Sequence, residues 1–282
     1  MKIATWNVNS IRTRLDQVMQ WLVVNPVEVL CLQETKVVDP DFPRSPLEAL
    51  GYNLYCAGQK SYNGVAILSR APLEQVSAGF APVLTDPELH STALSLDEQK
   101  RVITGVLPGN LRIVNLYVPN GSAIGSEKYL YKLSWLAMLR QYLQQLQSTK
   151  ANEILICGDF NIALEDRDIH DPTGRETHIM ASDLERQALQ SVLELGFADS
   201  LRKFTPDGGQ FSWWDYRAAS FRRNQGWRID HHYLTAGLYE RAIGCQIDIT
   251  PRKLPQPSDH APVIIELQSS ELLPSSQKIE GE

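Results

Sequence analysis

The chain contains the stretch Ile154-Leu155-Ile156-Cys157-Gly158-Asp159-Phe160-Asn161-Ile162, in which an apolar run ends in a glycine, a carboxylate and a carboxamide. A short apolar run bounded by glycine predicts a strand that is covered on both faces. Because side chains alternate along a strand, Asp159 and Asn161 are expected to point to the same side. The alternative is a turn in which these two side chains bond their own backbone. Repetition of the pattern elsewhere in the chain favours a site.

Several other predicted strands begin or end in polar residues. Residues 3–10 end in two asparagines, residues 27–32 lead into a carboxylate, and residues 111–117 end in a tyrosine. Polar residues at the carboxyl ends of strands lie where α/β-type folds place their chemistry. Two later strands, at 228–234 and 262–267, carry carboxylates and a histidine near their starts. The residues collected in this way are Asn7, Asn9, Glu34, Tyr117, Asn120, Asp159, Asn161, Asp230, Asp259 and His260.

The composition of the 282 residues, 43% hydrophobic and 21% charged, is typical of a soluble globular protein. The net charge of −6 argues against holding nucleic acid through the overall field, so a polyanion must be met by a local patch or by metal ions. No apolar run approaches the roughly 20 residues of a membrane span, and the amino terminus has no signal-peptide profile. We therefore expect no membrane partner and a cytoplasmic location. The four separated cysteines indicate reduced core residues.

Local patterns predict many strands and three strong helices. Two antiparallel hairpins are expected, at 52–68 and 101–117. The helices are expected near 15–22, at 126–148, and after the capping box Ser182-Asp183-Leu184-Glu185. Residues 165–180 are interpreted as a long surface loop.

No linker divides residues 1–268, so we predict a single domain with two stacked sheets flanked by helices. Residues 269–282 have no packing pattern and are expected to form a disordered tail. A weak echo between Trp6-Asn7-Val8-Asn9 and Gly158-Asp159-Phe160-Asn161 would fit two similar halves that face each other.

The strand-end residues favour hydrolysis of a phosphate ester at a metal ion. Carboxylates with amides and few histidines suit a hard cation such as Mg²⁺ or Mn²⁺, and Glu34 is our first choice of ligand. His260 directly follows a carboxylate, and an aspartate such as Asp230 can hold its ring in one tautomer. The remaining histidines are interpreted as core or surface residues: His90, His170, His178, His231 and His232.

The motifs that hold these residues together resemble the exonuclease III family, within the endonuclease/exonuclease/phosphatase superfamily. They run from residue 5 to 263 in family order. Gly158-Asp159-Phe160-Asn161 and Ser258-Asp259-His260-Ala261-Pro262 belong to the whole superfamily. Gln33-Glu34-Thr35-Lys36, Trp213-Trp214-Asp215-Tyr216-Arg217 and Gly226-Trp227-Arg228-Ile229-Asp230 are typical of the apurinic/apyrimidinic endonuclease branch.

The resemblance implies an α+β fold of the DNase I type, a four-layer α/β sandwich in which two mixed sheets are flanked by helices. It also implies a DNA-repair nuclease that depends on a divalent metal. Such an enzyme cleaves duplex DNA 5′ to abasic sites and removes nucleotides or blocking groups from 3′ ends. We expect it to act as a monomer.

The resemblance assigns the metal to Glu34 with help from Asn7 and Asn9. Asp259 is either a second metal carboxylate or a support for His260. Further roles concern the reacting phosphate: Tyr117 and Asn120 contact it, and Asn161 positions the attacking water.

Two roles have alternatives within the family. His260, oriented by Asp230, contacts the scissile phosphate or serves as the base, while Asp159 activates water or protonates the leaving 3′ oxygen. Physical chemistry supports such a division, because hydrolysis needs a neutralised phosphate, an activated water and a stabilised leaving group.

Trp213, Trp227 and Ile229 match the walls of a pocket for a sugar without its base. The alternative for the tryptophans is core packing, which we favour for Trp214. A local patch for DNA is expected from basic residues in or beside the site loops: Lys36, Arg222, Arg223 and Arg228, with Arg12, Arg14, Lys60, Lys128, Lys132, Arg252 and Lys253.

Two other functions compete with the nuclease. A phosphatase or phospholipase of the same superfamily is disfavoured, because the tryptophan motifs fit a nucleic-acid site and no lipid-binding apolar surface is evident. A DNA- or protein-binding member without catalytic activity is disfavoured because no catalytic position is substituted.

Overall fold

Two mixed six-stranded sheets form the centre of the computed structural model, which describes residues 1–149 and 153–268. In the first sheet the strands lie in the order β11 (Ala242–Ile247), β12 (Val263–Leu267), β1 (Lys2–Asn7), β2 (Val29–Gln33), β4 (Val65–Ser69) and β3 (Asn53–Ala57). In the second sheet the order is β5 (Glu74–Ala78), β6 (Val102–Leu107), β7 (Leu111–Tyr117), β8 (Glu153–Asp159), β10 (Asp230–Thr235) and β9 (Phe197–Asp199). Both predicted hairpins are confirmed, as the antiparallel pairs β3–β4 and β6–β7.

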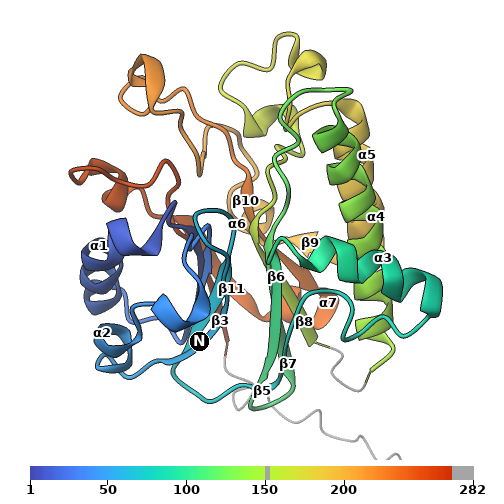
Figure 1. Cartoon of the computed structure of the whole chain (residues 1–282). Coiled ribbons are helices and arrows are strands. Elements are labelled where there is room, and N and C mark those ends of the chain that lie inside the picture. The colour runs from blue at the N-terminus through green and yellow to red at the C-terminus, as the bar shows by residue number, and fades with distance from the viewer. Residues whose placement is uncertain (150–152, 269–282) are drawn as a thin grey trace, which may run out of the picture.

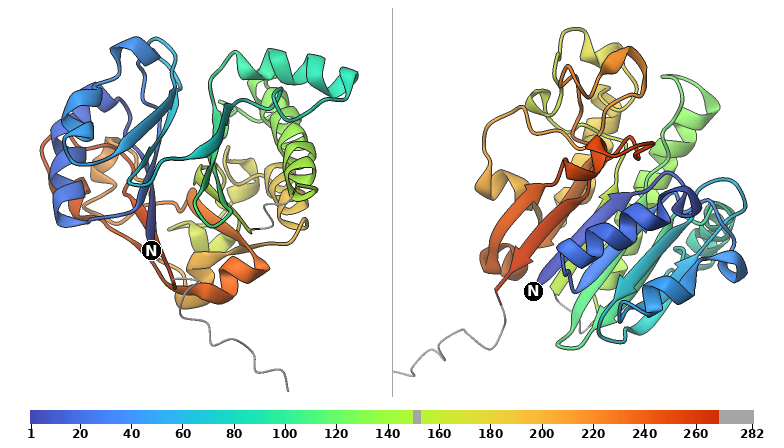
Figure 2. Two further views of the ribbon diagram at one scale, coloured as in Figure 1. Left: turned by 90° about the horizontal axis from the view of Figure 1, so that it is seen from below. Right: turned by 90° about the vertical axis from the view of Figure 1, so that its left-hand side faces the viewer.

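Helices cover the outer face of each sheet, which gives the predicted α+β four-layer sandwich (Figure 1). The first sheet is covered by α1 (Ile11–Val24) and α2 (Arg44–Glu48), and the second by α3 (Pro87–Asp97), α4 (Glu127–Gln147) and α5 (Asp183–Leu193). The view from below in Figure 2 shows the two sheets between these helices. The shorter helices are α6 (Ser200–Phe204), α7 (Ala236–Arg241), η1 (Asp39–Asp41), η2 (Asp166–Asp168), η3 (Arg175–Thr177), η4 (Arg217–Ala219) and η5 (Thr250–Lys253).

Side-chain alternation along the strands builds the layers. In β1, Ile3 faces the second sheet, whereas Trp6 packs with α1 on the outer face. In β8, Leu155 faces the first sheet, whereas Ile154 and Ile156 pack with α4. Both faces of these strands are therefore buried, which explains their continuous apolar runs.

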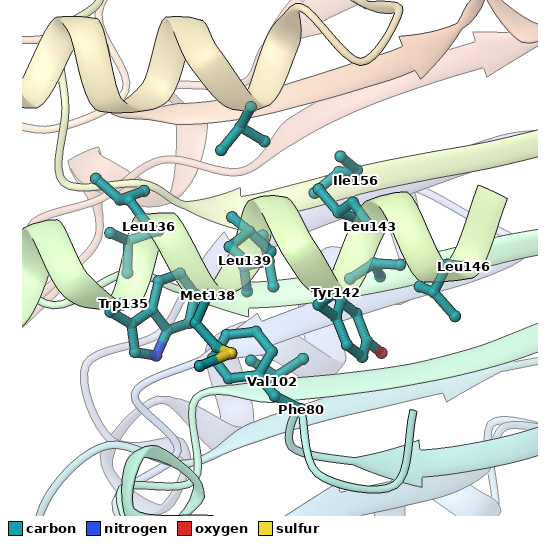
Figure 3. Packing of buried hydrophobic residues seen from close by; sticks show 14 of the residues in the cluster. Phe80, Val102, Trp135, Leu136, Met138, Leu139, Tyr142, Leu143, Leu146 and Ile156 are labelled. Carbon is teal, nitrogen blue, oxygen red and sulfur yellow. The ribbon is translucent and has the colours of Figure 1, made fainter. Parts of the chain in front are cut away.

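Helix α4 carries a large part of the core on its side of the molecule (Figure 3). The hydroxyl of Ser126 accepts from the backbone N–H of Tyr129 at 3.2 Å and caps the first turn. Trp135 and Tyr142 pack against Phe80, with ring centroids 5.0 and 5.3 Å apart. This packing holds α4 against the second sheet.

Each sheet has a parallel pair of strands near its centre, and one helix connects the members of each pair. Helix α1 joins β1 to β2, and α4 joins β7 to β8. The carboxyl ends of these four strands lie at the same edge, at the top in Figure 1. The sequence echo falls at matching places, because Asn7 ends β1 and Asp159 ends β8 in the facing sheet.

The structure differs from the sequence-based expectation in several segments, including α3 and residues 165–180. Helix α3 was not expected, because only Ala93 and Leu96 are buried on it and its apolar stripe is short. Its amino terminus is capped by Asp86. Residues 165–180 were expected to be a surface loop, yet Asp168 and Met180 are buried.

Three further expectations concern the carboxyl-terminal tail, membrane-spanning helices and the cysteines. The tail predicted at 269–282 lies outside the described residues. Among the helices that the structure describes, none has the length and apolar character to cross a membrane. The four cysteines are free, and Cys31, Cys157 and Cys245 are buried as predicted, whereas Cys56 is only half-buried.

A glycine is required immediately before Asp159. Gly158 has φ of 142°, and a Cβ atom placed on it would lie 1.9 Å from the backbone oxygen of Leu116 in β7. We expect Gly158→Ala to lower the free energy of unfolding, measured in urea, by about 1–3 kcal/mol or more, the cost of overpacking a core. Gly244→Ala is the control, because its nearest neighbour would be the Cβ of Glu266 at 3.9 Å. Equal stability of the two variants would contradict this account.

Candidate active site

The side-chain amide of Asn7 joins the two sheets at their shared edge. Its Nδ2 donates to Oε1 of Glu34 at 2.9 Å and to Oδ2 of Asp159 at 2.8 Å. Glu34 directly follows β2 of the first sheet, whereas Asp159 ends β8 of the second. Asn7 is fully buried, so these bonds form away from bulk water, where hydrogen bonds to charged groups are strong. One amide group therefore hydrogen-bonds a carboxylate from each of the two facing sheets.

Glu34 lies in a setting that binds cations. The ammonium of Lys36 lies 2.7 Å from Oε2 of Glu34 and donates to Oδ1 of Asn9 at 2.5 Å. Burial would raise the pKa of Glu34, but Lys36 and the Asn7 amide outweigh it and hold that pKa below its usual value. Glu34 is therefore an anion beside a neutral amide oxygen, which is the oxygen donor type that hard divalent cations prefer.

A histidine and an aspartate face Asp159 across the same edge. His260 precedes β12, and its Nδ1 lies 2.8 Å from Oδ2 of Asp230, the first residue of β10. The other ring nitrogen, Nε2, lies 3.7 Å from Oδ2 of Asp159. The hydroxyl of Ser212 donates to the same oxygen of Asp230 at 2.7 Å, so the aspartate that orients the imidazole is itself held in place.

Burial and the neighbouring charges shift the pKa values of Asp159 and His260. Burial raises the pKa of Asp159 to about 7, opposed by His260 and supported by the nearby carboxylates of Asp230 and Glu34. Burial alone would lower the pKa of His260, but the carboxylates of Asp230 and Asp159 raise it to about 10. The pair therefore combines an imidazolium with a carboxyl group that titrates near neutrality, a combination that suits proton transfer.

Two asparagines and a tyrosine line the second sheet's half of the site. The Nδ2 of Asn120 donates to Oδ1 of Asn161 at 3.0 Å, and the backbone N–H of Asn161 donates to Oδ1 of Asp159 at 2.9 Å. Tyr117 ends β7, and burial together with the Glu34 and Asp159 carboxylates raises its pKa well above the usual value. Its hydroxyl therefore stays protonated and can donate a hydrogen bond. Tyr117 and Asn120 also border a 630 Å³ cavity that Arg101 and Lys128 help to line.

Two half-buried tryptophans stand beside this cluster. Trp213 and Trp227 pair through their backbones, with N–H to oxygen distances of 2.9 Å in both directions. Both tryptophans pack against a small apolar cluster that contains buried Ile229. The indole Nε1 of Trp213 donates to Oδ2 of Asp259 at 3.0 Å, which ties the aromatic wall to the polar centre.

The ligand atoms and the backbone both indicate a constrained polar centre. One atom each of Glu34, Asp159 and His260 lie within 4.8 Å of one another, close enough to hold a metal ion. The backbone is left-handed at several of these positions, with φ of 45° at Asn9, 50° at Glu34, 55° at Lys36 and 49° at Asn161. Such conformations are disfavoured for residues with a side chain and concentrate at functional sites.

A family model described as Endonuclease/Exonuclease/phosphatase family matches residues 4–260. The chain belongs to this family. It is 36% identical over 279 residues to exodeoxyribonuclease III of Haemophilus influenzae, a match that covers 95% of this chain and 100% of the relative. Its fold is similar to a solved AP endonuclease from Archaeoglobus fulgidus (TM-score 0.86, 39% identity, 95% and 100% of the two chains). A 3′ phosphatase from Neisseria, solved with a product DNA hairpin, gives a TM-score of 0.87 at 39% identity, with the same coverage.

These relatives are the exonuclease III and AP endonuclease branch that the motifs resembled. The sandwich architecture and the order of the strand-end motifs agree with this membership. The strand-end residues come together at one edge as expected, and the one difference concerns Asp259. Asp259 is outside the cluster of Glu34, Asp159 and His260, and accepts hydrogen bonds from Asn9 and Trp213.

The expected basic patch is smaller than the sequence indicated. Arg228 was expected to contact DNA, but it is buried, with its guanidinium 2.6 Å from the carboxylates of both Asp168 and Asp199. These ion pairs connect Arg228 to η2 and to β9, so its guanidinium is engaged inside the protein. Lys132 and Arg252 are buried as well, whereas Arg222 and Arg223 are exposed and Lys36 is half-buried.

Sequence reasoning missed several supporting residues. Ser212 and Arg101 were not singled out, although Ser212 holds Asp230 and Arg101 lies over the Tyr117 ring at 4.6 Å. Ser212 could have been found from the sequence, because it directly precedes the tryptophan motif that begins at Trp213. His231 and His232 are buried and bond backbone oxygens, which confirms their interpretation as core residues. Trp214 is likewise buried, as we favoured.

The imidazolium of His260 links stability to pH. Because its folded-state pKa, about 10, exceeds the ordinary 6.5, the stabilisation is fully present below about pH 6.5 and is lost as the pH rises through about 10. We expect the stability advantage of the native protein over Asp230→Asn, measured by thermal melting in EDTA, to be largest near pH 6 and to shrink toward pH 10. An advantage that stays constant over this range would show that the ring is neutral.

Proposed function

We propose that this protein is a divalent-metal-dependent DNA-repair nuclease, which hydrolyses duplex DNA 5′ to abasic sites and removes nucleotides or blocking groups from 3′ ends. The observation that carries the proposal is the Asn7 amide, which holds Glu34 and Asp159 together beside His260. A carboxylate suited to a cation and a pair suited to proton transfer thus share one centre. The relatives act on the ends of DNA and on abasic sites according to their names.

The donor set fits Mg²⁺ or Mn²⁺. Glu34 would be the principal ligand, because its Oε2 and the Oδ1 of Asn9 already bind the ammonium of Lys36. Asn7 would assist, and Asp259 would either complete the set or support His260. When bound, the cation neutralises the phosphate and lowers the pKa of a coordinated water.

Asp159 and His260 would have separate roles, in proton transfer and in phosphate binding. Asp159 has a pKa near neutrality, so it can take a proton from the attacking water or give one to the leaving 3′ oxygen. His260, charged and oriented by Asp230, would bind the scissile phosphate through Nε2, since its Nδ1 is engaged. Because its raised pKa keeps it protonated at neutral pH, we favour this role over that of base.

The neutral donors would orient the phosphate and the water. Tyr117, with a raised pKa, and the Asn120 amide would donate to phosphate oxygens. Asn161 is held by its own backbone bond to Asp159 and by a 3.0 Å bond from its Nδ2 to the backbone oxygen of Val118. This placement would keep the attacking water in line with the phosphate.

Selectivity for abasic sites would come from Trp213, Trp227 and the Ile229 floor. A sugar without its base can enter a small aromatic pocket that an intact nucleotide would overfill. Exposed Arg222 and Arg223, with Lys36, would contact the DNA backbone. Residues 1–268 would act as one domain, because both sheets contribute residues to the site, and the protein would act as a monomer.

Removal of the anionic ligand tests the metal. Glu34→Ala should abolish Mg²⁺-supported incision of a duplex that carries one abasic site, because the cation would lose its principal anionic ligand and would be held mainly by neutral amides and water. Glu74→Ala, at an exposed position on the edge strand β5, is the control. Near-normal turnover of Glu34→Ala at low Mg²⁺ would remove Glu34 from the metal site. A native protein that releases phosphate from inositol phosphates, but leaves this DNA intact, would favour the phosphatase.

Truncation of the tryptophans tests the pocket. We expect Trp213→Ala and Trp227→Ala each to weaken abasic-site incision by about 1–3 kcal/mol, by analogy with base–aromatic stacking. Cleavage of a nonspecific activated phosphodiester should fall less. The control is Trp214→Ala, a core truncation expected to cost about 3–5 kcal/mol of stability and to reduce both reactions equally. If Trp213→Ala and Trp227→Ala behave like Trp214→Ala in melting and in both reactions, the pocket assignment is wrong.

A further inference from the structure

Lys132 is a fully buried lysine directly behind the active site. It lies on α4, and its ammonium donates to the backbone oxygen of Asn161 at 2.7 Å and to that of Asn120 at 3.2 Å. The third donor goes to Oε1 of Glu185 at 2.5 Å. An ammonium has three donors, so all of them are used inside the protein and none is directed at solvent.

The two carbonyls belong to the loops that carry the site's paired asparagines. One loop follows β7 and the other follows β8, and the side chains of Asn120 and Asn161 are themselves hydrogen-bonded at 3.0 Å. Asn161 has left-handed backbone geometry, with φ of 49°. Lys132 therefore bonds both loops from behind at the residues whose side chains face the reacting groups.

Glu185 in turn fixes the position of the ammonium. It is fully buried at the third position of α5, where its Oε2 accepts from the backbone N–H of Ser182 in a capping box. Its Oε1 also accepts from the N–H of Met180 at 3.0 Å. The chain of contacts runs from α5 through Glu185 and Lys132 to both catalytic loops.

We propose that Lys132 is a positioning residue for the reaction, which holds the Asn120 and Asn161 loops in one fixed geometry through their backbone oxygens. This inference rests on the proposed nuclease function. The simpler alternative is that Lys132 only balances the buried charge of Glu185. The two accounts differ, because a buried ion pair that is merely structural can be replaced by neutral groups without loss of function.

The first test is Lys132→Met, which keeps most of the aliphatic stem that lies against Gly121 but removes the three donors. Well below its melting temperature, kcat for abasic-site incision should fall by about 100-fold, because small misplacements of reacting groups cost about that much, while KM changes little. Glu185→Gln is the matched control. It breaks the same ion pair but leaves the lysine donors on both loops, so its kcat should fall far less.

Charge balance is separated from positioning by the double variant Lys132→Met with Glu185→Gln. It leaves no unpaired buried charge, so its melting temperature should recover relative to Lys132→Met alone. If kcat stays low while the melting temperature recovers, Lys132 positions the loops. If kcat recovers with the melting temperature, the lysine only balances charge and the inference is overturned. This variant also answers the question if Lys132→Met alone does not fold.

A double-mutant cycle asks whether Lys132 acts through Asn161. In an Asn161→Ala background, Lys132→Met should reduce kcat by much less than in the native background, because the side chain that the loop positions has gone. Equal reductions in both backgrounds would contradict the inference. The native enzyme in the same assay reports separately on the proposed function: if it does not incise abasic DNA with Mg²⁺, the nuclease proposal fails, whereas the variant ratios concern only Lys132.

Discussion

Two hydrogen bonds from one buried amide, that of Asn7, connect the sheets where the chemistry would occur. They form because the carboxyl ends of the central parallel strands meet at one edge, so Glu34 and Asp159 approach from opposite sheets. Deeper in the sandwich, Asn115 of β7 donates to the backbone oxygens of Leu32 and Ala66 in the first sheet. The separation of the sheets is thus set by buried polar contacts as well as by apolar packing.

Much of the fold could be predicted from local patterns. The hairpins, α1, α4, the capping box of α5 and the apolar strand that ends at Asp159 follow from spacing that the sequence displays directly. The order of the strands does not, because β1 pairs with β12, where Lys2 lies opposite Glu266. Such pairings join distant segments, so local patterns do not reveal them, although the position of the polar residues at strand ends already indicated that these residues share one site.

Buried charges were the hardest to predict. Arg228 and Lys132 look like surface residues in the sequence, since an isolated basic side chain is usually solvated. Their partners, Asp168 and Glu185, are 60 and 53 residues away along the chain, so no local pattern pairs them. Helix α3 was missed for a different reason. Its buried stripe is so short that only its cap and its proline indicate a helix.

The left-handed backbone at Asn9, Glu34, Lys36 and Asn161 constrains which residues can evolve at these positions. Each of these conformations costs on the order of 1 kcal/mol or more, and a glycine would adopt it more cheaply. Glycine, however, would remove the side chains that we propose bind the cation, the DNA backbone and the attacking water. At these positions, selection for heat resistance and selection for catalysis would therefore favour opposite residues, so extra stability must be acquired elsewhere in the sandwich.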